Sequence, residues 1–227
     1  MIARNGESPK TLASVLVDRI RADIVSRVLP PGSKLRLREL SARYETGINP
    51  LREALARLAA VGLVLVEDQR GFRVAPVSMH DLEDLTRVKR QIYAIALRAS
   101  IERGDVAWEA RVIAAHHELA RVTPSKPGSA VADEAAFEQY HRRFHTALIE
   151  ACDSPWLMHF HDVLYEQSLR YHGQAMQHGD TWRDSRREHR AIMKAVLARD
   201  ADAAVKLFNE HVGLTTDFLA HVRGLSP

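Results

Sequence analysis

Apolar residues recur at steps of three and four through the first part of this chain, a period that predicts helices. The first predicted helix covers residues 11–27 and a short one covers residues 38–44. A further helix begins at Asn49 and Pro50, with Asn as its cap and Pro in its first position. We expect it to end at Gly62, because glycine favours the left-handed backbone that closes a helix.

The pattern changes after Gly62. Two short runs rich in apolar residues, 63–66 and 72–74, flank the polar stretch 67–71, which is typical of a β-hairpin. Helix, turn, helix and hairpin in this order predict a winged helix-turn-helix in residues 1–76. In that fold the second helix of the pair enters the major groove of DNA and the hairpin lies along the flanking groove.

Residues 77–227 form the second predicted domain and show no strand pattern. Ala75-Pro76-Val77 is the expected boundary, and long helical patterns separated by short loops follow it. These features predict an all-α antiparallel bundle, and hence a mainly α protein. The expected helices cover residues 79–103, 107–122, 130–151, 155–177, 181–198 and 200–223.

Charge is distributed unevenly along the chain. Residues 1–77 hold 13 Lys and Arg against 8 Asp and Glu, a net charge of +5, whereas the remainder holds 19 against 21, a net charge of −2. A basic first third suits a DNA-binding head. With one cysteine, no apolar run near the length that spans a bilayer and no apolar signal segment, we expect a cytoplasmic protein without membrane contact.

The ordered motifs of the first domain resemble the GntR superfamily of bacterial repressors. The matching segments are Pro31-Gly32-Ser33-Lys34-Leu35, Arg38-Glu39-Leu40, Pro50-Leu51-Arg52-Glu53-Ala54-Leu55, Gly62-Leu63-Val64 and Arg70-Gly71-Phe72-Arg73-Val74. The resemblance and the groove geometry imply that operator DNA contacts Arg38, Gly47, Ile48, Asn49, Arg52, Gln69, Arg70 and Gly71. Ile48 stands where the family commonly has a polar residue. Its side chain cannot hydrogen-bond to guanine, but it could touch a thymine methyl group.

Four of the twelve histidines form a candidate metal site. His141 and His145 are four residues apart and therefore share one helix face. His189 and His211 lie 11 residues before and after Asp200, the centre of the turn between the last two helices, so they can meet in an antiparallel hairpin. Four imidazoles suit Zn²⁺, Ni²⁺ or another borderline divalent ion.

The histidine pattern also resembles the helical effector domain of the FadR C-terminal type, which follows the DNA-binding head in one GntR branch. That domain carries a metal pocket, and His141 stands where its pattern commonly has Asp, a difference that makes this site more cationic. The resemblance implies a small carboxylate effector whose far end meets a cation. The candidate effector-binding residues are Lys89, Tyr93, Arg142 and Arg170. Softer matches, including Trp108-Glu109 and Cys152-x-Ser154, resemble the glutarate-responsive, carbon-starvation-induced repressors of this branch.

These patterns predict a metabolite-responsive transcriptional regulator, a repressor rather than an enzyme, that binds double-stranded operator DNA as a homodimer. Two alternatives remain open at this point. One is a metalloenzyme built on the four histidines, although Glu188 lies about 100° around the helix from His189 and is poorly placed as a general base. The other is a DNA-binding protein in which the metal is purely structural.

Overall fold

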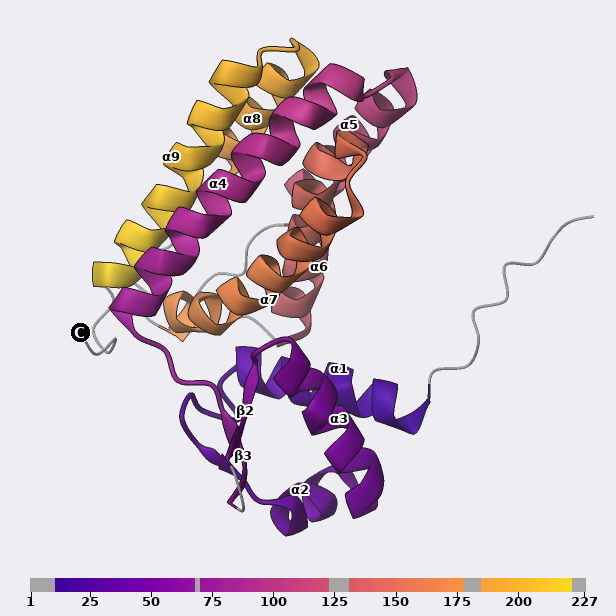
Figure 1. The fold of residues 1–227 in the computed structure, drawn as a ribbon, viewed down its shortest axis with the longest axis vertical. Helices are drawn as coiled ribbons and strands as arrows, with labels where there is room; N and C mark the ends of the chain where they lie inside the picture. The colour runs from indigo at the N-terminus through magenta and orange to yellow at the C-terminus, as the bar shows by residue number, and fades with distance from the viewer. Residues whose placement is uncertain (1–10, 68–69, 123–130, 178–184, 222–227) are drawn as a thin grey trace, which may run out of the picture. The chain divides into compact units, whose positions relative to one another are not determined.

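The computed structural model describes residues 11–67, 70–122, 131–177 and 185–221. The chain divides into two compact units, Met1–Pro76 and Val77–Pro227, and each is described by itself. Figure 1 shows the helices and strands of both units along the chain.

The first unit holds three helices and a small antiparallel sheet in its described part. Its elements in chain order are α1 (Leu12–Val25), β1 (Lys34–Leu35), α2 (Leu37–Tyr44), α3 (Ile48–Ala60), β2 (Val64–Glu67) and β3 (Gly71–Val74). The strand order is β1-β3-β2, with Leu35 opposite Phe72 and Val64 opposite Val74. Gly71 opens β3 with a φ of 92°, a left-handed conformation that suits the turn of the wing.

The apolar face of α3 anchors this unit. Leu51, Leu55 and Leu58 are at most 1% exposed and pack with Leu16 and Ile20 of α1. Each fully buried leucine contributes roughly 1.5–3 kcal/mol to folding. The opposite face of α3 is thereby left exposed to carry polar contacts.

The expected start of α3 was wrong by two residues. The helix begins at Ile48 after the cap residue Gly47, whose backbone is extended, and no side chain caps it. Pro50 therefore occupies the third helical position, where its missing N–H costs nothing because the first turn has no intrahelical acceptors. Gly62 follows α3 with a φ of 73°, as expected of a residue that ends a helix.

The second unit is helical throughout its described part. Its elements are α4 (Met79–Arg103), α5 (Val106–Arg121), α6 (Val131–Ile149), the 3-10 turn η1 (Glu150–Cys152), α7 (Pro155–Gln177), α8 (Arg186–Leu197) and α9 (Ala201–His221). The long helix α4 packs along α9 and α7, while α5 packs against α6 and α8 (Figure 1). Ser78 caps α4 by accepting a hydrogen bond from the Asp81 amide, as its position before the helix predicts.

The predicted fold class is confirmed: a winged helix-turn-helix with a small β-hairpin wing, followed by an all-α antiparallel bundle. The bundle core contains large side chains such as Trp108, Tyr93, Phe144 and Phe208, all fully buried. Within the described ranges, no helix combines the length and apolarity that crossing a bilayer requires.

Candidate functional site

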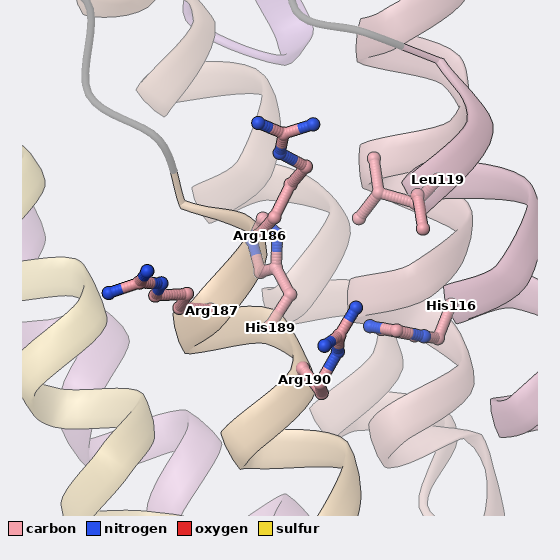
Figure 2. Close-up of a pocket in the computed structure, with 7 residues that line it drawn as sticks. His116, Leu119, Arg186, Arg187, His189 and Arg190 are labelled. Carbon is pink, nitrogen blue, oxygen red and sulfur yellow. The ribbon is translucent and has the colours of Figure 1, made fainter.

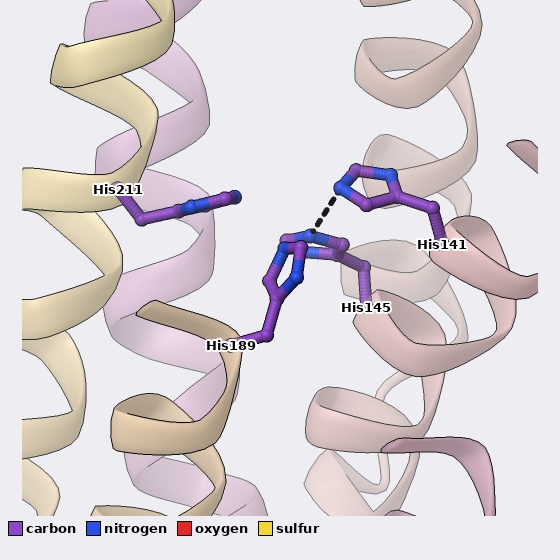
Figure 3. Close-up of side chains that lie close together, drawn as sticks. All are labelled: His141, His145, His189 and His211. Carbon is purple, nitrogen blue, oxygen red and sulfur yellow. Dashed lines mark hydrogen bonds between the residues drawn. The ribbon is translucent and has the colours of Figure 1, made fainter. Parts of the chain in front are cut away.

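The four histidines singled out in the sequence converge inside the bundle. His141 and His145 come from α6, His189 from α8 and His211 from α9, and Figure 3 shows all four rings pointing toward one common centre. Each side chain is at most 9% exposed. Three helices therefore contribute to a single buried cluster.

The separations between the imidazoles suit one shared ion. Each histidine offers a ring nitrogen that lies within 4.8 Å of those of the others. The Nε2 atoms of His141 and His145 are 3.1 Å apart, close to the separation of about 3.3 Å that two Zn–N bonds of 2.0–2.1 Å give at a tetrahedral angle. Nδ1 of His145 is buried and has no hydrogen-bond partner among the described residues. The donor set fits a borderline divalent cation.

Two of the histidines are oriented through their outer nitrogens. The Tyr165 hydroxyl donates to the Glu138 carboxylate and lies 2.9 Å from Nδ1 of His141, so it accepts the proton of that nitrogen. The Glu188 carboxylate lies 2.7 Å from Nδ1 of His211. Both contacts place the ring proton on Nδ1 and turn the unprotonated Nε2 toward the centre, as a metal ligand requires.

Electrostatics also favour neutral rings at the centre. Burial, followed by the influence of His141, His211, His189 and Lys89, holds the pKa of His145 well below its usual value. A neutral imidazole keeps the lone pair that binds a metal.

Lys89 is the candidate effector residue that lies nearest the cluster. It lines a narrow cavity together with His141, Ser168 and Tyr171, and its Nζ atom is 3.3 Å from the Ser168 hydroxyl. Burial lowers the pKa of Lys89 to about 8. A cation thus lies beside the histidine cluster, as an anionic ligand would require.

The other three candidate effector residues are engaged elsewhere and are not part of the described lining of this cavity. The Tyr93 hydroxyl lies 2.7 Å from Nδ1 of His161. Arg142 forms ion pairs with Asp162 and Glu166, and Arg170 pairs with Asp81 at 2.9 Å.

The described candidate DNA contacts lie in α2, around the start of α3 and at the wing. Arg38, Gly47, Asn49, Arg52, Arg70 and Gly71 are exposed, and Ile48 is half-buried. Gln69 lies outside the described residues. Arg52 directly follows the buried Leu51 and so lies about 100° around α3 from it, with its side chain exposed to solvent.

Sequence reasoning missed the residues that orient the histidines. From the sequence, Glu188 is a poorly placed general base beside His189, but in the structure its carboxylate contacts His211 on the next helix. The symmetry about Asp200 that paired His189 with His211 could have revealed it, because Glu188 is one residue further from the turn. No sequence signal singled out Tyr165 or Glu138.

Two family models match the chain, one in each unit. Residues 12–74 match the bacterial regulatory proteins of the gntR family, and residues 84–214 match the FCD domain.

Two curated relatives cover most of the chain. The transcriptional regulator BphR of Paraburkholderia xenovorans is 38% identical over 89% of this chain and 83% of its own length. The transcriptional repressor GlaR of Escherichia coli is 32% identical over 85% of this chain and 89% of its own. Among solved structures, E. coli McbR/YncC superposes with a TM-score of 0.72 at 18% identity, covering 93% of this chain and 98% of its own, which shows the shared fold.

Proposed function

The chain belongs to the GntR family of bacterial regulatory proteins and carries an FCD domain, and we propose that it responds to a metabolite. It is a DNA-binding transcriptional regulator, as its relatives are. We infer that it is a cytoplasmic repressor that binds double-stranded operator DNA as a homodimer. In this proposal it senses a small carboxylate through a divalent metal ion, Zn²⁺ or Ni²⁺, in the helical unit.

The convergence of His141, His145, His189 and His211 carries this proposal. A bound ion would offer a coordination position to one carboxylate oxygen of the effector. The far end of the effector would meet Lys89, the cation in the wall of the neighbouring cavity. Because the ligands come from α6, α8 and α9, occupancy of the site can favour one arrangement of these helices over another.

The contact between Glu188 and His211 supports a binding role over a catalytic one. A metalloenzyme needs a general base beside an open coordination position. Glu188 is instead hydrogen-bonded to the outer nitrogen of a candidate ligand, 2.7 Å away, which orients that ligand.

On the DNA side, the exposed arginines Arg38 and Arg52 and the wing residue Arg70 support operator binding. One winged helix reads few base pairs, so two half-sites and a homodimer are expected. Light scattering should give about twice the 25.5 kDa of one chain. A mass of one chain at micromolar concentration that does not change on operator DNA would contradict the dimer.

The sensing proposal is tested by titrating dicarboxylic acids of three to six carbons against operator binding in a mobility-shift assay. Four samples are compared: metal-loaded wild type, chelated wild type, His189→Ala, and the control His117→Ala, which removes an exposed histidine. We expect an acid to change operator affinity only in metal-loaded wild type and in the control. If an acid still changed operator affinity in chelated wild type, the metal would have only a structural role. If no acid changed operator affinity in any sample, carboxylate sensing would be refuted.

A further inference from the structure

The start of α4 packs in a small apolar cluster that is separate from the main core of the bundle. The buried members of this cluster are Leu82 of α4, Tyr171 of α7 and Leu219 of α9. Val77 and Met79, which lead from the domain boundary into α4, pack against it. Figure 1 shows the start of α4 beside the later turns of α7 and the end of α9. The cluster therefore holds the first residues of the helical unit in place.

These first residues are close to the DNA-binding unit along the chain. Four residues, 75–78, separate the wing strand β3 from α4. One of them is Pro76, whose ring fixes a backbone angle and so limits how far the connection can bend. A shift of the first turn of α4 is therefore passed along the chain toward β3.

The same cluster forms part of the wall of the cavity beside Lys89. Leu82, Tyr171 and Leu219 all line that cavity. Its volume is about 30 Å³, room for roughly two water molecules and far below the roughly 300 Å³ of a small ligand pocket. A dicarboxylate that reaches from the metal to Lys89 needs more space than this. Its entry must therefore displace side chains of the wall.

Tyr171 connects this wall to the first turn of α4. Its hydroxyl donates a hydrogen bond to the Asp81 carboxylate, and the Arg170 guanidinium donates to the same oxygen at 2.9 Å. The backbone amide of Asp81 donates to the hydroxyl of Ser78, the cap of α4, at 3.1 Å. A displacement of the Tyr171 ring must either break its hydrogen bond to Asp81 or carry the first turn of α4 with it.

A larger hollow of the helical unit does not offer this connection. It lies between α5 and α8 and has a volume of about 280 Å³, and Figure 2 shows His116 and Leu119 of α5 and His189 and Arg190 of α8 in its lining. Within the described part of the chain, its lining shares no residue with the cavity beside Lys89 and includes none from α4. A ligand in that hollow would press on α8 without touching the start of α4.

We propose that the hydrogen bond between Tyr171 and Asp81 couples the cavity beside Lys89 to the DNA-binding unit. Entry of the carboxylate displaces the Tyr171 ring, and the first turn of α4 moves with it through Asp81. The turn is the element with two arrangements that effector and operator both bias. This inference rests on the effector site proposed above and names how occupancy of that site is transmitted. Tyr171 and Asp81 are thus positioning residues for the response.

The test separates effector binding from the response to it. Tyr171→Phe keeps the ring in the cavity wall and removes its hydroxyl, and Asp81→Ala removes the acceptor. The control is Asp84→Ala, because Asp84 lies one turn further along α4 and pairs with Arg87 of the same helix. The probes are malonate, succinate, glutarate and adipate. Calorimetry on zinc-loaded protein measures their affinity, and mobility shifts measure operator affinity with and without saturating acid.

We expect Tyr171→Phe to bind the active acid, and the operator without acid, within about threefold of wild type. The change in operator affinity that the acid causes should be smaller by roughly threefold to tenfold, the effect of losing one hydrogen bond. Asp81→Ala should reduce the change at least as much, since Arg170 also loses its acceptor, whereas Asp84→Ala should respond as wild type does. Two variants that interrupt one contact from opposite sides keep the test decisive if one of them is less stable.

A full response to the acid in both variants would overturn the coupling. Loss of acid binding in Tyr171→Phe would also overturn it, because the hydroxyl would then belong to the effector site itself. If no acid changed operator affinity even in wild type, the sensing proposal would fall and this one with it. The response of wild type therefore distinguishes the two failures.

Discussion

The Glu188 carboxylate on α8 lies 2.7 Å from Nδ1 of His211 on α9. This contact joins the two helices at the level of the histidine cluster and fixes which nitrogen of His211 faces the centre. An outer partner of this kind also raises the basicity of the ligand nitrogen. Glu188 therefore acts on the cluster through a neighbour, although its own side chain does not point into it.

We predict that Glu188→Gln lowers metal affinity by roughly tenfold to a hundredfold, because the neutral amide orients His211 less firmly. Competition with a chelating dye measures the affinity. Glu210→Gln is the matched control, since Glu210 precedes His211 but is exposed to solvent. Equal zinc affinity in Glu188→Gln and wild type would remove Glu188 from the orienting role.

A second prediction concerns Arg52. Replacing it by alanine should weaken operator binding by about 1–3 kcal/mol if the guanidinium reads a base edge. Mobility shifts on the same operator measure the loss. Arg57→Ala is the control, because Arg57 lies on the same helix but pairs with Glu53 and with Ser14. Arg52→Ala binding as tightly as Arg57→Ala would exclude a base contact by Arg52.

The pH dependence of stability should report the buried His161. Its Nδ1 pairs with Tyr93 and its Nε2 lies 3.0 Å from the Thr146 hydroxyl, and burial lowers its pKa to about 4. Below pH 6.5 the His161 imidazole is protonated in the unfolded chain but stays neutral in the folded protein. The free energy of unfolding therefore falls as the pH drops toward 4. Between pH 7.5 and 5 this one group should cost about 2 kcal/mol of the free energy of unfolding.

Urea unfolding of metal-free protein at the two pH values, followed by circular dichroism, measures this loss. His161→Gln should show a decrease smaller by about that amount. The exposed-site variant His117→Gln should behave as wild type does. If His161→Gln lost as much stability as wild type between the two pH values, another group would be responsible.

Much of the fold could be predicted because helical periodicity is local. The bounds of α4 and α7 agree with the predicted ranges 79–103 and 155–177, since a cap residue or a proline marks where each begins. The strand β1 escaped prediction because Lys34 and Leu35 are too few to show alternation, and their pairing with β3 is a long-range contact.

In the candidate site, too, local sequence patterns predict some features, whereas others depend on packing between helices. The spacing of His141 and His145, and the register of His189 with His211, follow from helix geometry, and the structure places all four side chains together. The contacts of Tyr165 and Glu188 depend on how neighbouring helices are rotated against each other, which no single-helix pattern encodes. For the same reason the sequence did not reveal that Arg142 pairs with Asp162 and Arg170 with Asp81.

The last prediction concerns Lys89, whose amine lies in the wall of the cavity beside His141. Burial lowers its pKa to about 8, whereas Glu138 opposes that shift. A bound carboxylate would hold the ammonium form, so binding is coupled to protonation of Lys89. Effector affinity should therefore fall as the pH rises through 8, by roughly tenfold between pH 7.5 and 9.

Calorimetry of zinc-loaded protein with the acid that is active in the operator assay measures this dependence. Lys89→Met removes the charge but retains much of the side-chain volume, so its zinc content should match wild type. The affinity of Lys89→Met for the acid should already be low at pH 7.5. Up to pH 9 it should show only the pH dependence that comes from the metal site. If Lys89→Met bound the acid as tightly as wild type with the same pH dependence, the far end of the effector would have to meet another group, and the cavity beside Lys89 would not be the effector site.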